Sequence, residues 1–355
     1  MDVRSGCYVA RMVDTSSLES WVLRGTARLP RRLTQRLTGP AVVVEGQTLD
    51  HDMAVAIALA KAQRAEMDGV PVSQARRMMA RSSRLVGGHQ PIGAVTDRTI
   101  DGPGGPLRLR FYTPRGVDGP TPALVFFHGG GFVMGDLDTH DALCRFVAEH
   151  AQVRIVAVDY RLAPESPFPA AVEDAVAAWR WVHEHATGLA IDAARIAVGG
   201  DSAGGNLAAV VSQEMVHWRG PVPAFQWLIY PVTDFSAKTA SRERFADGFI
   251  LTDALMDVFE SSYLVGDENR TDPRLSPLHG DVTGLPPAHL VTAGFDPLRD
   301  EGEAYARKMS AAGVKVSFHR EAGLVHSFAS MVGYGTSAPA AMRRAARALR
   351  KGLSS

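Results

Sequence analysis

From about position 95 the chain repeats one pattern, in which a short apolar segment is followed by a turn and then by a segment of helical period. The apolar segments predict strands over residues 95–100, 107–112, 123–128, 155–158, 196–198, 225–230, 289–292 and 314–319. The first two flank the turn-rich DGPGGP and predict an antiparallel hairpin. Helices are predicted over residues 142–149, 172–184, 205–216, 301–312 and 339–351. Because apolar strands that alternate with helices form a mostly parallel sheet covered on both faces, the chain is predicted to be an α/β protein.

Two parts of the chain depart from this pattern. Residues 1–94 carry helical patterning, at 49–67 and 72–85, and the connection over about 231–285 is too long for a simple crossover. Long insertions in compact domains are usually lids or binding elements. We therefore expect an N-terminal extension with cap helices over 1–94 and a main domain over 95–355. The insertion at about 231–285 would add a second cap segment over the carboxyl edge of the sheet, where open α/β sheets bind ligands.

Charge balance and cysteine content exclude several classes of protein. Lys plus Arg equal Asp plus Glu, at 38 each, so no strong attraction to nucleic acid is expected. Cys7 and Cys144 lie far apart without CxxC spacing, which argues against a disulfide framework or a zinc site and fits a reducing compartment. The N-terminus lacks the apolar core of a secretory signal, and no stretch approaches the roughly 18 apolar residues of a membrane span. A cytoplasmic protein is the expectation.

The segment WVLRGTARLPRRLTQR, residues 21–36, leaves one alternative open. It places five arginines around Trp21 and three leucines. Arginines that flank apolar residues can bind an anionic membrane surface, so a peripheral membrane association is one interpretation. The simpler interpretation is a solvated helix packed on the body of the protein.

The sequence GDSAG at 200–204 has the form GxSxG and lies between a predicted strand, RIAVG, and a predicted helix, GNLAAVVSQEM. Such a pattern should occur by chance roughly 0.2 times in a chain of this composition, so the motif alone is weak evidence. The strand before it and the helix after it favour a catalytic role over a chance match. A sharp strand-to-helix turn strains its serine, and glycine on either side leaves room for it. The turn exposes the Ser202 hydroxyl beside the helix N-terminus, whose dipole favours negative charge. Ser202 is therefore the candidate nucleophile, and a glycine-rich helix start is the alternative.

The sequence HGGGF at 128–132 follows the predicted strand ALVFF. Glycines without side chains let backbone N–H groups approach a substrate oxygen closely, which an oxyanion hole requires. We expect Gly130 and Gly131, with the N–H of Ala203, to hold the oxyanion, and His128 to be structural. A phosphate-binding loop is the alternative, but no GK[ST] follows and no lysine is nearby.

A nucleophilic serine needs a base, and the base needs an orienting acid. His326 follows the last predicted strand, and Asp296 directly follows the strand AHLVTAG, so both should emerge at the sheet edge that carries Ser202. The order serine, aspartate, histidine is the one found with such a nucleophile turn. His326 is therefore the predicted base and Asp296 the predicted acid.

Other residues of the right chemical types are weaker candidates. Asp300 and Glu301 begin a predicted helix, where acidic residues often serve as first-turn charges. His319 lies within a predicted strand and His279 in the long insertion, so packing or surface roles are expected for both. The HEH sequence on a predicted helix lacks the HExxH spacing of a zinc site, and the glycines around Ser202 lack the acidic residue of a dinucleotide fold. No metal or cofactor is predicted.

HGGGF, DYRLAPESPFPAAVEDA, GGDSAGGNLA and AGFDPLRDEGEAYA together resemble the hormone-sensitive-lipase group of esterases, and particularly its actinobacterial members. The resemblance covers roughly residue 95 to the end. It implies an α/β-hydrolase fold with an eight-stranded sheet and a helical cap, and hydrolysis of short- to medium-chain acyl esters without a cofactor. Residue by residue it implies the same assignments as above: Ser202, Asp296 and His326 as triad, and Gly130, Gly131 and Ala203 as oxyanion donors.

The chain departs from this group in two places. Ser327 follows the predicted base, where the group usually has glycine, and the first 45 residues extend beyond the usual cap. Two other functions remain as alternatives to a soluble-ester hydrolase. One keeps the catalysis but changes the substrate: the protein would be an interfacial lipase acting on lipid surfaces, or an amidase. The N-terminal arginines favour the lipase over the amidase. The other is a non-catalytic binding protein like the plant gibberellin receptors, which lose the catalytic histidine that is present here as His326.

Overall fold

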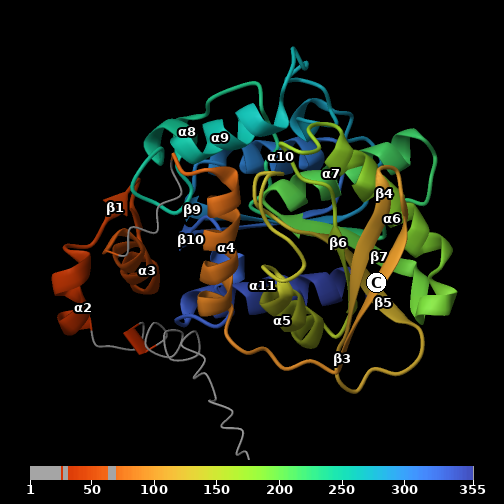
Figure 1. Ribbon diagram of the computed structural model, residues 1–355, viewed down its shortest axis with the longest axis horizontal. Coiled ribbons are helices and arrows are strands. Elements are labelled where there is room, and N and C mark those ends of the chain that lie inside the picture. Colours follow the sequence, from red (N-terminus) through yellow and green to blue (C-terminus); the bar gives the residue numbers. More distant parts are fainter. Residues whose placement is uncertain (1–24, 27–30, 63–68, 355) are drawn as a thin grey trace, which may run out of the picture.

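One mixed sheet of eight strands forms the centre of the protein in the computed structural model, which describes residues 25–26, 31–62 and 69–354. The strand order is β10-β9-β8-β7-β5-β6-β4-β3. The strands are β3 (Ala94–Gly102), β4 (Gly105–Thr113), β5 (Thr121–Phe127), β6 (Arg154–Asp159), β7 (Ile191–Asp201), β8 (Phe225–Ile229), β9 (Ala288–Phe295) and β10 (Val316–Val325). Figure 1 shows helices on both sides of the sheet.

The pairing of the strands follows the sequence pattern. The strands from β10 to β6 run parallel to one another, whereas β3 and β4 form an antiparallel hairpin that joins the sheet through β6. A tight turn at Gly102–Gly105 joins the antiparallel strands β3 and β4. Each connection between consecutive parallel strands contains at least one helix, because such a connection must cross from one end of the sheet to the other. The predicted α/β fold with a mostly parallel eight-stranded sheet is confirmed.

Helices cover the two faces of the sheet in separate layers. One face packs on α5 (Asp141–Ala151) and α11 (Ser337–Gly352), and the other on α6 (Ala170–Glu184), α7 (Ala203–His217) and α10 (Arg299–Ala311). Strand β5 explains the division, since Val125 and Phe127 pack into the α6–α7 core while Leu124 and Phe126 pack into the α5–α11 core. Successive side chains of a strand point to opposite faces, so a fully apolar strand supplies both cores.

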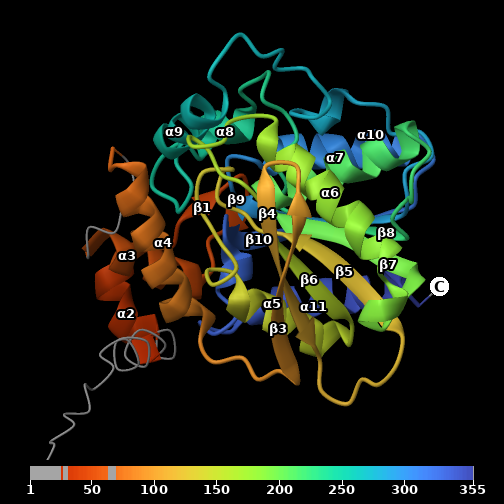
Figure 2. The same cartoon turned by 45° about the vertical axis from the view of Figure 1, so that its right-hand side comes forward.

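The helices before position 95 lie beside the sheet, at the left of Figures 1 and 2. They are α2 (Arg31–Thr38), α3 (His51–Ala62) and α4 (Val72–Gly87), with the small hairpin β1 (Val43–Val44) and β2 (Gln47–Thr48) between α2 and α3. The insertion contributes α8 (Ala240–Arg244) and α9 (Asp253–Tyr263), which lie together above α4 in both views. The sequence pattern predicted α3 and α4, but not β1 and β2, which are only two residues long each.

Asp52 ties the N-terminal helices to the last helix of the chain. The buried Asp52 carboxylate accepts hydrogen bonds from the backbone N–H groups of Thr336, at 2.6 Å, and Ser337, at 3.3 Å. These groups belong to the first turn of α11, where N–H groups have no partner within the helix. An aspartate 284 residues away in sequence from Thr336 therefore caps α11.

No helix in the described part of the chain combines the length and the apolar character that a membrane crossing requires. In the predicted membrane-contact segment, Trp21, Arg24, Arg28 and Leu29 lie outside the described residues. Arg32 and Arg36 are exposed on α2, and so are Leu33, at 65% of its full exposure, and Leu37, at 47%.

Candidate active site

The carboxyl ends of β7, β9 and β10 bring the predicted triad residues together. Ser202 follows the last residue of β7, Asp296 the last residue of β9, and His326 the last residue of β10. His326 Nε2 lies 3.0 Å from Ser202 Oγ, and His326 Nδ1 lies 2.8 Å from Asp296 Oδ2. Asp296 Oδ1 accepts the backbone N–H of Leu298 at 2.9 Å, which fixes the carboxylate. Serine, imidazole and carboxylate thus form one hydrogen-bonded chain in which all three side chains are buried.

Ser202 occupies a strained turn between β7 and α7. Its φ of 55° and ψ of −119° lie outside the regions that side chains with a Cβ favour. The turn is packed against the end of β5, because a Cβ on Gly200 or Gly204 would overlap the carbonyl oxygen of Phe127. The Ser202 N–H donates to the carbonyl of Ile229 at 2.9 Å, which attaches the turn to β8. The GxSxG glycines are therefore required by packing, and the serine conformation is held from both neighbouring strands.

Gly130 and Gly131 form a tight loop after β5, and both have positive φ, of 121° and 63°. A Cβ on Gly130 would overlap the backbone of Met134, and one on Gly131 the ring of Phe259. No residue in the described ranges accepts a hydrogen bond from the N–H of Gly130 or Gly131. Ala203 is the first residue of α7, where the N–H likewise has no partner within the helix. The loop borders the pocket that contains Ser202, and Ala203 directly follows Ser202 in the chain.

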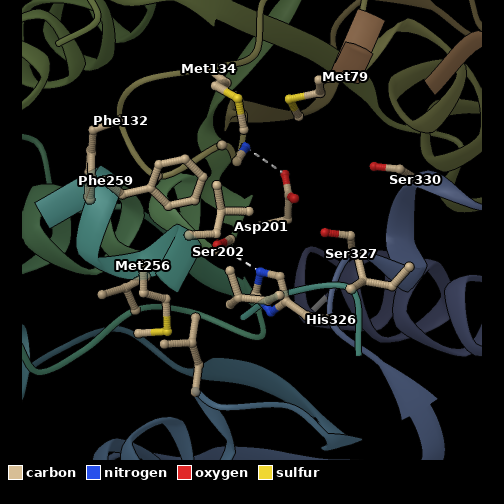
Figure 3. A pocket seen from close by; sticks show the side chains of 18 of the residues that line it. Met79, Phe132, Met134, Asp201, Ser202, Met256, Phe259, His326, Ser327 and Ser330 are labelled. Atoms are coloured by element: carbon tan, nitrogen blue, oxygen red, sulfur yellow. Dashed lines mark hydrogen bonds between the residues drawn. The ribbon is translucent and has the colours of Figure 1, made fainter. Parts of the chain in front are cut away.

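Asp201 connects the nucleophile turn to the glycine loop. Its buried carboxylate accepts the backbone N–H of Gly129 at 2.9 Å, one residue before Gly130 (Figure 3). His140 Nε2 lies 3.3 Å from Asp201 Oδ1, close enough for an ion pair although not aligned for a hydrogen bond. Burial disfavours the Asp201 carboxylate, but the imidazole of His140 and the Gly129 N–H outweigh it, so the pKa of Asp201 lies below its usual value. A buried anion thus holds the glycine loop in place.

The aromatic residues around this loop are also buried. The His128 ring stacks on Tyr160 with 4.3 Å between ring centroids, and the Tyr160 hydroxyl donates to the His128 carbonyl at 2.6 Å. Burial, together with the nearby His140, lowers the pKa of His128 to about 4. His128 is therefore neutral at ordinary pH and packs beneath the loop, in the structural position that the sequence predicts.

Glu301 is a buried carboxyl close to the triad. Its Oε1 accepts the backbone N–H of Thr233 at 2.7 Å, and the nearby Asp234 and Asp296 carboxylates oppose its ionisation. Burial raises the pKa of Glu301 to about 8. Glu301 therefore keeps its proton at neutral pH, and it braces the backbone after β8 instead of orienting His326.

The pocket above Ser202 has two walls of different chemistry. Helix α9 supplies apolar side chains, of which Met256 and Phe259 are shown at the left of Figure 3. Helix α4 and the turn after His326 supply hydroxyls as well as apolar groups: Ser82, Ser83, Ser327 and Ser330, together with Met79, Val86 and Met331. We call the first the apolar wall and the second the serine wall. The triad lies at the base of the pocket, between them.

The rival acid and base candidates are engaged elsewhere. The Asp300 carboxylate accepts the backbone N–H of Ser241 and pairs with Arg299, and His279 Nε2 lies 3.1 Å from Asp234 Oδ1. His319 is half exposed on β10, 3.4 Å from Glu321. Within the ranges that the structure describes, no three metal-ligating side chains come together.

The sequence analysis did not identify Asp201, His140 or Tyr230 as parts of the site. The Tyr230 hydroxyl contacts Asp201 at 3.4 Å and accepts the N–H of Ala329, and its ring lies 4.5 Å from that of His326. Asp201 was the unspecified residue of the GxSxG motif, so its position beside the nucleophile was the available signal. His140 and Tyr230 follow no recognisable spacing, and only the folded arrangement reveals them.

Comparison with known proteins agrees with this geometry. A family model described as alpha/beta hydrolase fold matches residues 124–330, more than half of the chain. The chain is 45% identical to the carboxylic ester hydrolase LipN of Mycobacterium tuberculosis, over 89% of this chain and 86% of that protein. It is 40% identical to an ethyl acetate hydrolase of Pseudomonas putida, over 80% of this chain and 93% of that protein.

Solved structures of ester hydrolases also superimpose on this chain. An ester hydrolase from the metagenome of Lake Arreo, determined with a bipyridine phosphonate derivative, superimposes with a TM-score of 0.83 at 41% identity, covering 86% of this chain and all of that one. The thermostable carboxylesterase EstE1 from a metagenomic library superimposes with a TM-score of 0.77 at 44% identity, covering 80% of this chain and 98% of that one.

Proposed function

The chain belongs to the α/β-hydrolase family, in its hormone-sensitive-lipase-like branch, and we propose on that basis that it is a serine carboxylester hydrolase with Ser202 as nucleophile. The observation that carries the proposal is the continuous chain of hydrogen-bonding atoms from Asp296 through His326 to Ser202. In this chain the Ser202 hydroxyl donates to His326 Nε2, and His326 Nδ1–H donates to Asp296.

The reaction proceeds in two steps through an acyl-enzyme. His326 takes the proton of Ser202 as its Oγ attacks the ester carbonyl, and then gives that proton to the departing alcohol oxygen. A water molecule, deprotonated by the same imidazole, attacks the acyl carbon, and the acid leaves as Ser202 regains its proton. Asp296 keeps His326 in the tautomer with a proton on Nδ1 and stabilises the imidazolium that forms.

The backbone N–H groups of Gly130, Gly131 and Ala203 are the proposed donors to the oxyanion of the tetrahedral intermediate. The glycines are supported because their N–H groups have no partner among the described residues and because both border the pocket that contains Ser202. Ala203 is supported because it directly follows Ser202 as the first residue of α7. Loss of one such donor typically costs about 3 kcal/mol of transition-state stabilisation. Because they are backbone groups held by packed glycines, they need no reorganisation when charge develops.

The substrates are proposed to be esters of short- to medium-chain acids. The apolar wall, with Phe259 packed directly over Gly131, closes the space beside the oxyanion donors. The cap that forms this space consists, in this proposal, of helices from residues 1–94 and of the insertion at about 231–285. Both contribute to the pocket, through Met79 of α4 and Met256 of α9.

Contact with a lipid surface is a second proposal, supported by helix α2. Leu33 and Leu37 are exposed on it at a spacing of one turn, next to the exposed Arg32 and Arg36. Such a helix can place leucines among acyl chains and arginines among anionic headgroups. Sedimentation with vesicles of anionic or neutral lipids tests the contact, which requires binding to the anionic vesicles and its loss in Leu33→Ser/Leu37→Ser.

The enzymatic proposal is tested by hydrolysis of p-nitrophenyl esters from acetate to palmitate, with Ser202→Ala as the control. The expected result is a maximum at short chains and a decrease in kcat of about 10⁴-fold or more in Ser202→Ala. A folded protein that hydrolyses none of these esters and is not labelled by an organophosphonate would overturn it in favour of a binding function. A rate that rises sharply on emulsified long-chain esters would favour the interfacial lipase.

A further inference from the structure

Ser327 lies next to the proposed catalytic base, in a conformation that side chains rarely adopt. Its φ is 65° and its ψ is 12°, in the left-handed region that favours glycine. Glycine would therefore meet the backbone requirement of this turn without strain, yet the chain carries a serine. A residue kept against its backbone preference at a functional site invites a search for what its side chain does.

The Ser327 hydroxyl faces the pocket and has no partner there. Ser327 lines the pocket, and neither its hydroxyl nor that of Ser330 makes a hydrogen bond to any residue of the described part of the chain. The two serines are joined by a tight turn, in which the Ser330 N–H donates to the Ser327 carbonyl at 3.1 Å. Figure 3 shows both hydroxyls directed toward the space above Ser202 and His326.

The serine wall continues onto helix α4. The turn that contains Phe328–Ser330 packs against α4, and Ser82 and Ser83 of that helix border the same pocket. Ser83 is satisfied by the carbonyl of Ala80 at 3.2 Å. Ser327 directly follows the base in the chain and Ser330 belongs to the same turn, and both hydroxyls remain available to a ligand. A half-buried hydroxyl with both donor and acceptor capacity matches another hydroxyl.

The position of the base decides which part of an ester meets this wall. His326 must reach the oxygen of the departing alcohol to protonate it, so the alcohol lies beside His326 and the residues that follow it. The acyl carbon also carries Ser202 Oγ, the oxyanion and the acyl chain, so the acyl chain takes the side of the pocket away from His326, where Phe259 packs on Gly131. The apolar wall thus faces the acyl chain, and the serine wall faces the alcohol.

We propose that Ser327 and Ser330 form a subsite for a hydroxylated alcohol, so that the enzyme prefers esters of polyols such as glycerol over esters of simple alkanols. The inference rests on the proposed esterase function and specifies its substrate class. Each serine exchanges a hydrogen bond with a free hydroxyl of the alcohol, on a carbon one or two positions beyond the carbon that is bonded to the ester oxygen. Met79 and Met331 of the same wall cover the carbon skeleton of the alcohol.

The test compares two esters that share an acyl group and a three-carbon alcohol: glycerol monobutyrate and propyl butyrate. The wild type is expected to have the higher kcat/KM with the glycerol ester. Ser327→Gly, Ser327→Ala and Ser330→Ala should each lower the ratio of the two kcat/KM values about 3- to 10-fold, the usual worth of one hydrogen bond. The ratio is the readout because it cancels any general effect of the substitutions on the turn.

Ser261→Ala is the matched control, since Ser261 is an exposed serine of α9 bonded to the Val258 carbonyl, and it should leave the ratio unchanged. A third ester, propyl 4-hydroxybutyrate, carries its hydroxyl on the acyl side and should gain nothing over propyl butyrate. A wild-type ratio near one, a ratio unmoved in the three variants, or a preference for the hydroxyacyl ester would each overturn the subsite. Failure to hydrolyse any of the three esters would instead refute the esterase function.

Discussion

The sheet edge and the helices above it are held by different kinds of interaction. At the sheet edge Ser202, Asp296 and His326 each follow a strand directly, and backbone hydrogen bonds and packed glycines fix them. The helices above depend on ion pairs. Arg76 of α4 pairs with Glu165 at 2.7 Å, and Arg242 of α8 contacts three carboxylates.

We expect the sheet edge to determine the rate of the chemical step and the helices above it to determine substrate selectivity. Backbone contacts of a sheet tolerate little displacement, and catalysis loses about 100-fold when reacting groups shift by 1 Å. Ion pairs and methionine side chains at the pocket walls adapt more easily. Substitutions at the sheet edge should therefore change kcat, and substitutions in the helices above should change KM and substrate preference.

The sharpest test of this comparison is Asp201, which belongs to the sheet edge and lines the pocket but has no role in the proposed proton transfers. Asp201→Ala should lower kcat about 100-fold, with a smaller change in KM, because the Gly129 N–H loses its acceptor and the proposed oxyanion donors are misplaced. Asp201→Asn keeps an acceptor and should recover most of that loss. Steady-state kinetics with p-nitrophenyl butyrate measures both. Equal losses in the two variants would show that the negative charge, not the position of the loop, is what matters.

The complementary substitution is Arg242→Leu in the helices above. Arg242 is buried and pairs with Asp253 at 2.6 Å and Glu260 at 2.7 Å, so its loss leaves these carboxylates with only their more exposed partners, Lys238 and Arg270. We expect the free energy of unfolding to fall by about 2 kcal/mol and KM to rise several-fold, with kcat less affected. Denaturant unfolding and kinetics are the measurements. The control is Lys238→Met, which removes an exposed partner of the same Asp253 and should change both quantities little. If Arg242→Leu lost as much kcat as Asp201→Ala, the proposed difference between the two regions would be wrong.

The stability of the folded protein should depend on pH through Glu301, which lies at the sheet edge. Its pKa is raised from 4.5 to about 8, so the folded protein binds a proton that the unfolded chain releases above about pH 4.5. The stability from this proton is complete below that pH and is lost as the pH rises through about 8. Glu301→Gln keeps a neutral side chain, and its melting temperature should fall less between pH 5 and 8 than that of the wild type. An unchanged slope, equal to that of the exposed Glu184→Gln, would mean that Glu301 is ionised in the fold.

The smallest effect is expected for Arg108, whose ion pair resembles that of Arg242 in length but not in burial. Arg108 lies 2.7 Å from Asp159, but its side chain is 56% exposed. Arg108→Ala should change the free energy of unfolding by less than about 0.5 kcal/mol and leave kcat unchanged. Thermal unfolding of this variant beside Arg242→Leu sharpens the comparison, because a similar loss in both would show that burial is not what distinguishes the two pairs.

The strands and the proposed triad are predictable from the sequence for one shared reason. A buried parallel strand is a short run of apolar residues, and the residue after it lies at the carboxyl edge of the sheet. Ser202 and Asp296 each follow such a run directly, and His326 comes shortly after the last predicted strand, so their proximity can be inferred without knowing any side-chain contact. The glycine loop after β5 is recognisable for the same reason.

The supporting residues are not predictable in this way. His140 reaches Asp201 from the start of α5, and Tyr230 reaches it from the end of β8, so both contacts depend on how layers pack. The two-residue strands β1 and β2 lie below the length at which alternation is detectable. The left-handed conformation of Ser327 was hidden too, although the absence of the usual glycine marked the position.

The capping of α11 by Asp52 has a consequence for how the protein is made. Asp52 leaves the ribosome 284 residues before its partner Thr336, a delay of about 15 to 60 s at ordinary rates of synthesis. During that time the amphipathic helix α4 has no completed C-terminal layer to pack on. We therefore expect the N-terminal helices to expose apolar surface until α11 has been synthesised. Nascent chains that stall before residue 336 are expected to need chaperones more than the finished protein does.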